Sequence, residues 1–465
     1  MTPGGPSRAA RAIEAALSRA AGGRPIPGNQ VRLFTDGPEI YQLMLDQIAS
    51  AERWIHLENY IIRDDVTGWR FAEALAARAR AGLPVRVTYD RLGSIGTGGK
   101  YWRFLRAAGV EVRGFNAPQL VRIFANLTRD HRKLLVTDGA WAITGGQCIG
   151  DEWAGDPVRE IPQWRDTAVE IRGPAASVLD SAFSVTWALS GPPLAPSEFA
   201  ADVPSTGEAE VRVIVGEPGR ERAYRALEYL TAGSMERLWI TDAYLVPPPR
   251  LFQAMLDAAR DGADIRLLVP STSDVPVVRN LTRIGYRRLL RAGIRIFEWD
   301  GPMLHAKTLV SDGRWARVGT SNLNASSLLG NYELDVLIED ETFAREMEAQ
   351  FRRDMESSLE VRRRAYPGPT RLQPMLPTAL ARQPSNRPPG RIRARREFRG
   401  RTAVAMRTVI SAARRSIYVP VSVGLVILGI LFIVLPSATA YAVGAVCVWL
   451  AFSAGLEAFA RRREG

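Results

Sequence analysis

Short apolar runs and periodically spaced apolar residues alternate along residues 30–200. Runs rich in Val, Ile, Tyr and Trp and bounded by turn residues are typical of strands, whereas apolar residues three or four positions apart are typical of helices. This pattern predicts strands at 31–34, 54–60, 85–89 and 110–115. It predicts helices at 39–51, 71–81, 102–108 and 175–189. Because strands alternate with helices, we expect βαβ units and a largely parallel sheet.

Residues 208–360 repeat this order of elements. Strands are expected at 210–215, 238–243, 265–269 and 294–298, and helices at 223–231, 251–261 and 285–292. Residues 194–207, between the two halves, hold several Pro, Ser and Gly residues, which is typical of a linker. The simplest assembly is a pair of α/β domains, residues 29–193 and 208–360, related by a pseudo-twofold axis.

The N-terminal segment, residues 1–28, differs in character from the two halves. It is mostly Ala, Arg, Gly and Pro, with one short helical stretch at 9–21. It contains no apolar run long enough for a signal peptide or a membrane span. We therefore expect a loose, basic arm.

Two apolar runs, 417–435 and 438–454, follow an Arg- and Pro-rich arm at 361–415. Neither run contains a charged residue, and the first is just long enough to span a bilayer at about 20 residues. The pattern predicts a two-span transmembrane hairpin at 416–460. Because arginines flank both of its outer ends, we expect both termini to be cytoplasmic. A re-entrant interfacial hairpin is the alternative, because the second run is short.

The basic balance of the chain, a net charge of +12, has two interpretations. A basic arm can bind nucleic acid, or it can lie beside a membrane, where each charge near anionic lipid contributes about 1 kcal/mol. The adjacent apolar runs favour the lipid interpretation. Cys148 and Cys447 lie in very different segments, so a disulfide framework is not indicated.

One short motif, His-x-Lys-x4-Asp-Gly, occurs twice, at residues 131–139 and 305–313. A small turn that contains glycine follows each copy at the same distance, at 145–148 and 319–322. The chain has three histidines and three lysines, and nearly all of its 61 Lys and Arg residues are Arg. Two of the lysines nevertheless lie two residues after two of the histidines. Both places therefore need a compact ammonium rather than a planar guanidinium.

Each motif places an imidazole and an ammonium together. His131 and Lys133 are two residues apart on a predicted strand, as are His305 and Lys307, so each pair points to one side. An ammonium repels a metal cation, so such a pair is a poor metal site. It is a good phosphate site, because the imidazole can attack or donate a proton while the ammonium offsets charge on the phosphate oxygens.

Three further residues have two interpretations each. Asp138 and Asp312 precede Gly in a hairpin turn signal, so each can be a turn residue or a catalytic residue. His56 stands on a predicted strand among large apolar residues, which favours a buried core histidine over a functional one.

Both motif copies resemble that of the phospholipase D superfamily, and their flanks are similar to those of bacterial cardiolipin synthases. The flanks that carry the resemblance are Arg129-Asp130-His131-Arg132-Lys133-Leu134-Leu135, Ile149-Gly150-Asp151-Glu152-Trp153, Trp164-Arg165-Asp166-Thr167, Leu304-His305-Ala306-Lys307 and Asn331-Tyr332-Glu333-Leu334. The resemblance covers roughly residues 30–355. It implies two phospholipase D-like α/β/α domains whose motifs face one cleft.

The resemblance also implies which residues form the site. The implied catalytic residues are His131, Lys133, Asp138, His305, Lys307, Asp312, Asp166 and Glu333. Of these, Asp166 and Glu333 orient the imidazoles, since a carboxylate on one ring nitrogen selects the tautomer. The implied substrate-binding residues are Asn322, Ser321, Gly145 and Gly146. The chain departs from the family at Cys148, the first-half counterpart of Asn322, because a thiol is a weak donor. It also departs at Ala168, where similar proteins often carry His.

The implied activity is a phosphatidyltransferase that joins two phospholipids through a phosphohistidine, without a metal or another cofactor. Phosphatidylglycerol is the expected donor, and phosphatidylethanolamine a possible second substrate. His131 is the favoured nucleophile and His305 the acid, at an anionic surface of a bacterial inner membrane. The family usually carries its anchor at the N-terminus, so the C-terminal hairpin is a departure. The alternatives are a membrane-bound phospholipase D that releases phosphatidic acid and a phospholipase D-like nuclease, although a nucleic acid partner is not favoured.

Overall fold

The computed structural model describes residues 8–116, 128–200 and 202–362. The predicted transmembrane hairpin and nearly all of the Arg- and Pro-rich arm lie outside these residues. No helix within the described ranges is both long and apolar enough to cross a membrane.

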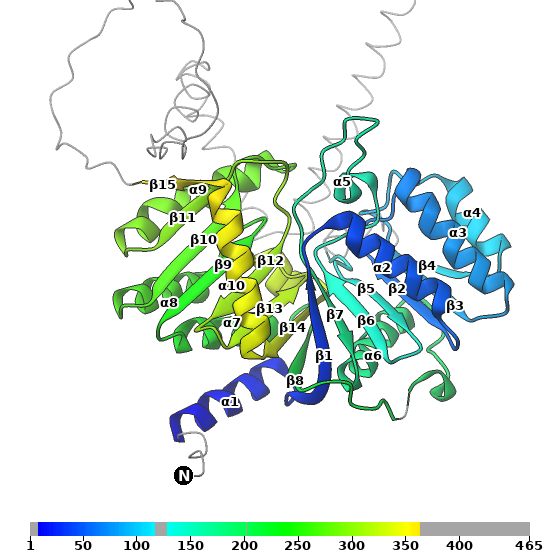
Figure 1. Cartoon of the computed structure of the whole chain (residues 1–465), viewed down its shortest axis with the longest axis horizontal. Helices are drawn as coiled ribbons and strands as arrows, with labels where there is room; N and C mark the ends of the chain where they lie inside the picture. Colours follow the sequence, from blue (N-terminus) through cyan, green and yellow to red (C-terminus); the bar gives the residue numbers. More distant parts are fainter. Residues whose placement is uncertain (1–7, 117–127, 201, 363–465) are drawn as a thin grey trace, which may run out of the picture. The chain divides into compact units, whose positions relative to one another are not determined.

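The elements of the first half begin with an N-terminal helix and end with a long helix (Figure 1). They are α1 (Arg8–Ala21), β1 (Ile26–Phe34), α2 (Gly37–Ser50), β2 (Ile55–Asn59), α3 (Val66–Arg80), β3 (Val85–Asp90), α4 (Gly99–Ala107), β4 (Glu111–Phe115), β5 (Lys133–Thr137), β6 (Trp141–Gly145), α5 (Asp151–Ala154), β7 (Ala168–Arg172) and α6 (Pro174–Ala188).

The second half repeats this order after a short 3-10 helix, Pro196–Glu198. Its elements are β8 (Ala209–Gly216), α7 (Arg222–Gly233), β9 (Arg237–Asp242), α8 (Pro249–Arg260), β10 (Asp264–Pro270), α9 (Pro276–Arg291), β11 (Arg295–Trp299), β12 (Lys307–Ser311), β13 (Trp315–Gly319), a π-helix (Ser326–Gly330), β14 (Glu333–Glu339), α10 (Glu341–Glu356) and β15 (Ser358–Val361). Helix α9 begins well before the predicted start at residue 285.

The strands of the described residues form one 15-stranded sheet whose two halves have the same strand order. From the centre outwards, the first half runs β1-β7-β6-β5-β2-β3-β4 and the second runs β8-β14-β13-β12-β9-β10-β11, with β15 added at the outer edge. Strands β1 and β8 pair antiparallel at the centre. The repeated order agrees with the expected pair of related halves.

The sheet is not largely parallel, so that prediction is wrong. In the described residues, parallel pairing joins only β2 to β3 to β4 and β9 to β10 to β11. The remaining pairs are antiparallel, including both motif strands with their neighbours. The physical reason lies in the Asp-Gly turns, since strands joined by a tight hairpin must run antiparallel.

Apolar side chains from both halves share one core. Leu179 and Phe183 on α6, Phe343 on α10, and Val136 and Val310 on the two motif strands all belong to a single buried cluster. All described residues fall within one compact unit. The shared core keeps the two motif strands at a fixed separation.

Helix α1 packs against the second half, so the prediction of a loose arm is wrong for the described part of residues 1–28. Leu17 is fully buried in the core beneath α7, together with Ala20. Glu14 also forms an ion pair with the buried Arg212 of β8. The helix is amphipathic, and burying its apolar face gains more than leaving the helix solvated.

His56 is a core residue, as predicted. Its imidazole is fully buried, lies 2.6 Å from Asp180 through Nδ1, and stacks on the Phe183 ring at 4.5 Å between centroids.

Candidate active site

The two motif histidines lie in extended segments just before β5 and β12, and each lysine is the first residue of its strand. The strand predicted from residue 131 thus begins at Lys133. Each segment is held by the other half of the chain. The His131 N–H donates to the Tyr332 carbonyl at 2.9 Å, and the His305 N–H donates to the Arg165 carbonyl at 2.7 Å. These bonds bring both motifs to the boundary between the halves.

Each imidazole contacts a carboxylate from the opposite half. Nδ1 of His131 lies 3.0 Å from both carboxylate oxygens of Glu333, and Nδ1 of His305 lies 2.7 Å from Oδ2 of Asp166. The contact fixes Nδ1 as the protonated ring nitrogen and leaves Nε2 with the lone pair. Asp166 and Glu333 therefore lie where an orienting role requires them.

The pKa values of these groups reflect deep burial beside like and unlike charges. Burial lowers the pKa of His131, and burial together with the Lys307 charge lowers the pKa of His305 to about 4. Burial alone would raise the pKa of Asp166 and of Glu333, but the adjacent imidazoles and lysines outweigh it and hold both values below the usual range. The carboxylates are therefore ionised at neutral pH.

Both lysines are buried and turned back toward the histidines. Nζ of Lys133 donates to the carbonyl oxygen of His131 at 2.6 Å, and Lys307 makes the same contact with His305. Burial lowers the pKa of Lys307 to about 8. Each imidazole is within electrostatic range of both ammonium groups. One site can therefore surround a single phosphate group with two imidazoles and two ammonium groups.

Aromatic rings line this site, and the sequence interpretation assigned them no role. The Tyr60 ring centroid lies 4.8 Å from that of the first imidazole and 5.1 Å from the Lys133 ammonium. The rings of Trp153, Trp164 and Tyr244 lie 5.8, 5.5 and 6.0 Å from the second imidazole. The only available signal was their position directly after β2 and β9 and beside the motif flanks.

Asp138 and Asp312 lie at the far ends of the motif strands. Five residues at roughly 3.3 Å each separate the two ends of a motif strand. Asp138 accepts hydrogen bonds from the backbone N–H groups of residues 52–54, and Asp312 from those of residues 235–237. Both have a positive φ, 59° and 51°, in their turns. These contacts support the turn interpretation of both aspartates, and their catalytic role stays a prediction.

The two predicted glycines are required by close contacts behind the site. A Cβ atom on Gly145 would come within 2.2 Å of the Thr167 carbonyl oxygen, and one on Gly146 within 2.0 Å of the Asp166 carboxylate. These glycines let Asp166 reach its imidazole. Their predicted role in substrate binding stays a prediction.

The other predicted substrate-binding residues differ in what their side chains do. Ser321 is fully buried, and its hydroxyl donates to Asp335 at 2.6 Å, which stabilises the turn; its substrate-binding role stays a prediction. The Asn322 side chain is nearly buried, and its Oδ1 has no hydrogen-bond partner. Cys148, at the matching position of the first half, is a free buried thiol whose pKa is raised by burial. The two halves therefore differ at this pair of positions, and the predicted role of Asn322 in substrate binding stays a prediction.

Comparison with known proteins decides the family. A family model described as cardiolipin synthase, PLD-like domain, matches residues 228–355. Cardiolipin synthase A of Pseudomonas aeruginosa is 34% identical over 339 residues, which are 72% of this chain and 69% of that protein. The chain belongs to the cardiolipin synthase family of the phospholipase D superfamily. It is thus an enzyme of the phosphatidyltransferase class.

Other relatives agree with this assignment. Cardiolipin synthase of Geobacillus thermodenitrificans is 33% identical over 316 residues, which are 67% of this chain and 63% of that protein. The crystal structure of the Haemophilus influenzae phosphatidylserine synthase has the same fold, with a TM-score of 0.58 at 14% identity. It covers 75% of this chain and 92% of that structure.

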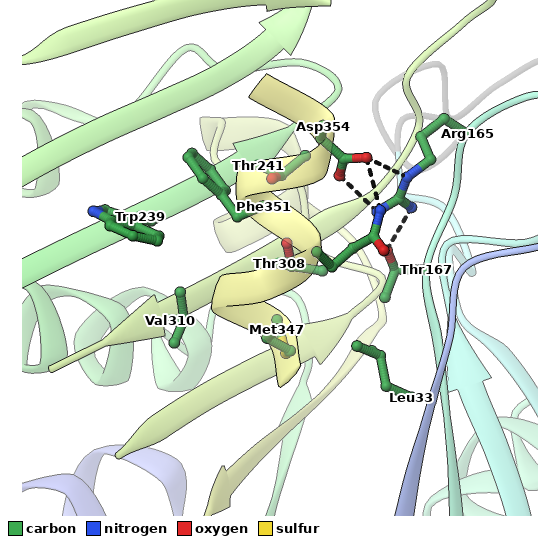
Figure 2. Close-up of a pocket in the computed structure, with 11 residues that line it drawn as sticks. Leu33, Arg165, Thr167, Trp239, Thr241, Thr308, Val310, Met347, Phe351 and Asp354 are labelled. Carbon is green, nitrogen blue, oxygen red and sulfur yellow. Dashed lines mark hydrogen bonds and ion pairs between the residues drawn. The ribbon is translucent and has the colours of Figure 1, made fainter. Parts of the chain in front are cut away.

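In this cardiolipin synthase relative, an arginine that the sequence interpretation missed holds Asp166 in place. The Arg165 guanidinium binds both carboxylate oxygens of Asp354 on α10, at 3.0 and 2.7 Å. It also donates to the Asp166 carbonyl and, at 2.9 Å, to the Thr167 hydroxyl. Figure 2 shows this clamp at the edge of a pocket that Phe351 and Met347 also line. The clamp ties the segment of Asp166 to the second half.

A second buried arginine, next to His131, also links the two halves of the chain. Arg132, fully buried, donates to the carbonyl oxygens of Glu333, Ala182 and Gly216 at 3.2, 2.9 and 3.2 Å. It occupies the variable position of the first motif, where the second motif has Ala306. Spacing alone gave no reason to expect that this position would bridge the halves.

Proposed function

We propose that this chain transfers a phosphatidyl group from phosphatidylglycerol to a second phospholipid and so produces cardiolipin. The observation that carries the proposal is the crossed arrangement of His131 with Glu333 and His305 with Asp166 around two buried lysines. Relatives at 34% and 33% identity are named cardiolipin synthases, which supports the same substrate class.

In the first step, Nε2 of His131 attacks the phosphorus atom of the donor. A phosphorus–nitrogen bond forms and the bond to the glycerol oxygen breaks. His305, as the imidazolium, gives its proton to that oxygen, and glycerol leaves. The bound anionic diester raises the low pKa of His305, because its charge offsets that of the lysines. Lys133 and Lys307 balance the charge that develops on the phosphate oxygens.

In the second step, neutral His305 takes the proton from the hydroxyl group of a second phosphatidylglycerol. That oxygen attacks phosphorus, the phosphorus–nitrogen bond breaks, and the first imidazole is restored. Two phosphatidylglycerols therefore give one cardiolipin and one glycerol. Phosphatidylethanolamine in place of the donor would release ethanolamine by the same steps. Both carboxylates hold Nδ1–H throughout, so each imidazole works through Nε2.

We further propose that the enzyme acts at the inner membrane of a bacterium, with its catalytic halves on the cytoplasmic side. Two observations support this location: the relatives are named for the synthesis of a membrane phospholipid, and the chain contains the apolar runs 417–435 and 438–454. The basic arm before these runs would add attraction to an anionic leaflet.

Product analysis with purified full-length chain tests the activity. Vesicles of phosphatidylglycerol with a labelled headgroup should yield cardiolipin and free glycerol in equal amounts. Phosphatidic acid as the main product would instead identify a hydrolase. No lipid change together with nicking of DNA would identify a nuclease.

A pair of lysine variants distinguishes a loss of catalysis from a loss of folded protein. Lys307→Ala should remove nearly all turnover, whereas Lys100→Ala, at an exposed lysine on α4, should leave turnover of a soluble short-chain diester at the wild-type rate. Equal turnover by Lys307→Ala and wild type would contradict the assigned chemistry.

A further inference from the structure

The edge of the sheet that carries the active site also carries exposed apolar side chains. Tyr60 follows β2 and Tyr244 follows β9, and both contact the histidines. The loops after β3 and β10 leave the same edge, because β3 is parallel to β2 and β10 is parallel to β9. Elements at the carboxyl ends of these strands therefore surround the mouth of the site.

Hydrogen bonds anchor these loops to residues that lie beside the catalytic histidines. Asp274, in the loop after β10, accepts from the Tyr244 hydroxyl at 2.7 Å. Asp90, at the end of β3, accepts from the N–H of Asp130, the residue before His131, at 3.0 Å. Anything that binds these loops therefore lies next to the reacting groups.

The same loops and helix starts present large apolar side chains to solvent. On the first half, Val66, Leu92 and Ile95 are 58%, 48% and 75% exposed. Val158, in the loop after α5, is 93% exposed, and the rings of Trp153 and Trp164 on either side of this loop contact His305. Figure 1 shows α5 and its loop at the upper edge of the molecule.

Helix α9 combines such apolar exposure with a uniformly basic composition. Leu281 and Ile284, which are 47% and 63% exposed, are three residues apart and so share one face. Arg287 and Arg288, one turn further on, are also exposed. The helix contains five arginines and no acidic residue between Pro276 and Arg291. A helix with exposed apolar residues and arginines beside them is suited to the interface of an anionic bilayer.

We propose that these residues form a lipid-docking rim, through which the catalytic unit itself seats its cleft on an anionic phospholipid surface. The rim consists of Val66, Leu92, Ile95, Val158, Leu281 and Ile284, with the arginines of α9 beside it. The inference rests on the proposed lipid substrate, because a cleft that takes a phosphodiester from a bilayer must meet the headgroup layer. It assigns membrane contact to the described residues, in addition to the segment after residue 362.

The rim can be tested in the full-length chain with paired substitutions. Leu281→Glu with Ile284→Glu places two carboxylates on the proposed lipid face. The matched control is Val178→Glu with Met235→Glu. Val178 is an exposed apolar residue in the first half of α6, and Met235 is an exposed apolar residue just before β9. Both lie toward the edge of the sheet opposite the rim, because Asp180 of α6 contacts Trp54 just before β2 and Met235 contacts the turn residue Asp312. Substrates are phosphatidylglycerol in mixed phosphatidylglycerol–phosphatidylcholine vesicles and a soluble short-chain diester.

The rim variant should lose about tenfold or more of its rate on vesicles, as expected if at least one apolar side chain loses its burial in lipid. It should keep the wild-type rate on the soluble diester, and the control variant should keep both rates. Equal vesicle rates for the rim variant and wild type would overturn the proposal. So would an equal loss on both substrates.

A direct readout of depth does not depend on turnover. A fluorophore attached to Ile284→Cys, in a chain carrying Cys447→Ser, should be quenched by lipids brominated on their acyl chains. The same fluorophore at Met235→Cys should not be quenched. Cys148 is buried and free, so the folded chain should label at the introduced thiol. Quenching at 284 without any lipid turnover would keep the rim and reject the proposed function, whereas turnover without quenching would reject the rim alone.

Discussion

The orientation of each imidazole depends on a carboxylate supplied by the other half of the chain. Asp166 and Glu333 are nearly fully buried and ionised, and each accepts from Nδ1–H. An amide in the same place can present its NH₂ group to Nδ1 and so favour the wrong tautomer. The geometry would survive while the chemistry fails.

We therefore expect Asp166→Asn and Glu333→Gln each to lower kcat on a soluble diester by about a hundredfold or more, by analogy with the loss seen when a triad aspartate becomes Asn. Steady-state kinetics on folded protein would measure this. A loss of less than about threefold in both variants would show that the carboxylates do not set the tautomer.

The motif aspartates should behave in the opposite way. Asp138→Ala removes the acceptor for three backbone N–H groups before β2, which should lower the free energy of unfolding by about 1 to 3 kcal/mol. Urea denaturation would measure the loss. The kcat of the remaining folded protein should stay close to wild type, because the carboxylate lies at the far end of the strand. A hundredfold fall in kcat at unchanged stability would support a catalytic role.

The charge of Lys307 should set the alkaline limit of activity. Its pKa is lowered to about 8, and only the ammonium form, which is present below that pH, attracts the phosphate. We expect kcat/KM on a soluble diester with a p-nitrophenolate leaving group, which needs no proton from His305, to fall as pH rises through about 8, toward tenfold per pH unit. In Lys307→Arg the residual activity should lack this limb, since a guanidinium stays charged. An unchanged limb in that variant would assign it to another group.

At the residue scale, the sequence predicted the paired histidines and lysines for two reasons. His and Lys are rare in this chain, and two of each recur at the same spacing in the repeated motif. It did not reveal the crossing of the carboxylates, which depends on contacts between residues 131 and 333 and between residues 166 and 305. Nor did it reveal Arg132 and Arg165 as bridges, because the roles of these arginines depend on which carbonyl oxygens the folded chain brings near them.

At the scale of elements, the predicted helices and strands lie close to those of the structure, but their pairing does not follow from the pattern. Helix α9 begins at Pro276, where a stretch with Val and Thr obscured the helical period. The Asp-Gly turns indicate hairpins, and the strands of these hairpins pair antiparallel. The alternation of strands and helices correctly indicates parallel pairing only for the outer strands, and the prediction extended it to the whole sheet. Packing of α1 depends on a partner surface on α7 that lies about 200 residues away in sequence.

Helix α1 provides a stability test of that packing. Leu17→Ala removes a fully buried side chain and should lower the free energy of unfolding by about 2 to 4 kcal/mol. Val185→Ala, at a partly exposed position on α6, should change it by only about 0.5 kcal/mol. Thermal or urea unfolding would compare them. An effect of Leu17→Ala as small as that of the control would mean that α1 is a loose arm after all.

At the scale of the whole molecule, the two halves act as one unit because each completes the other's histidine. The shared core holds both motif strands, and the backbone bonds from His131 to Tyr332 and from His305 to Arg165 close the site between them. Neither half alone contains both an imidazole and its own carboxylate partner. The account therefore requires one composite site with a division of labour between its two imidazoles.

Capture of the covalent intermediate tests this account most directly. Full-length chain carrying His305→Ala would be mixed with a phosphatidyl diester that has a p-nitrophenolate leaving group, which departs without an acid. After a rapid quench under mildly alkaline conditions, peptide mass spectrometry would locate the adduct. We expect about one equivalent of nitrophenolate and a phosphatidyl group on His131, with neither signal in His131→Ala. No adduct on either histidine, or an adduct on His305 in the wild-type and His131→Ala chains, would contradict the account.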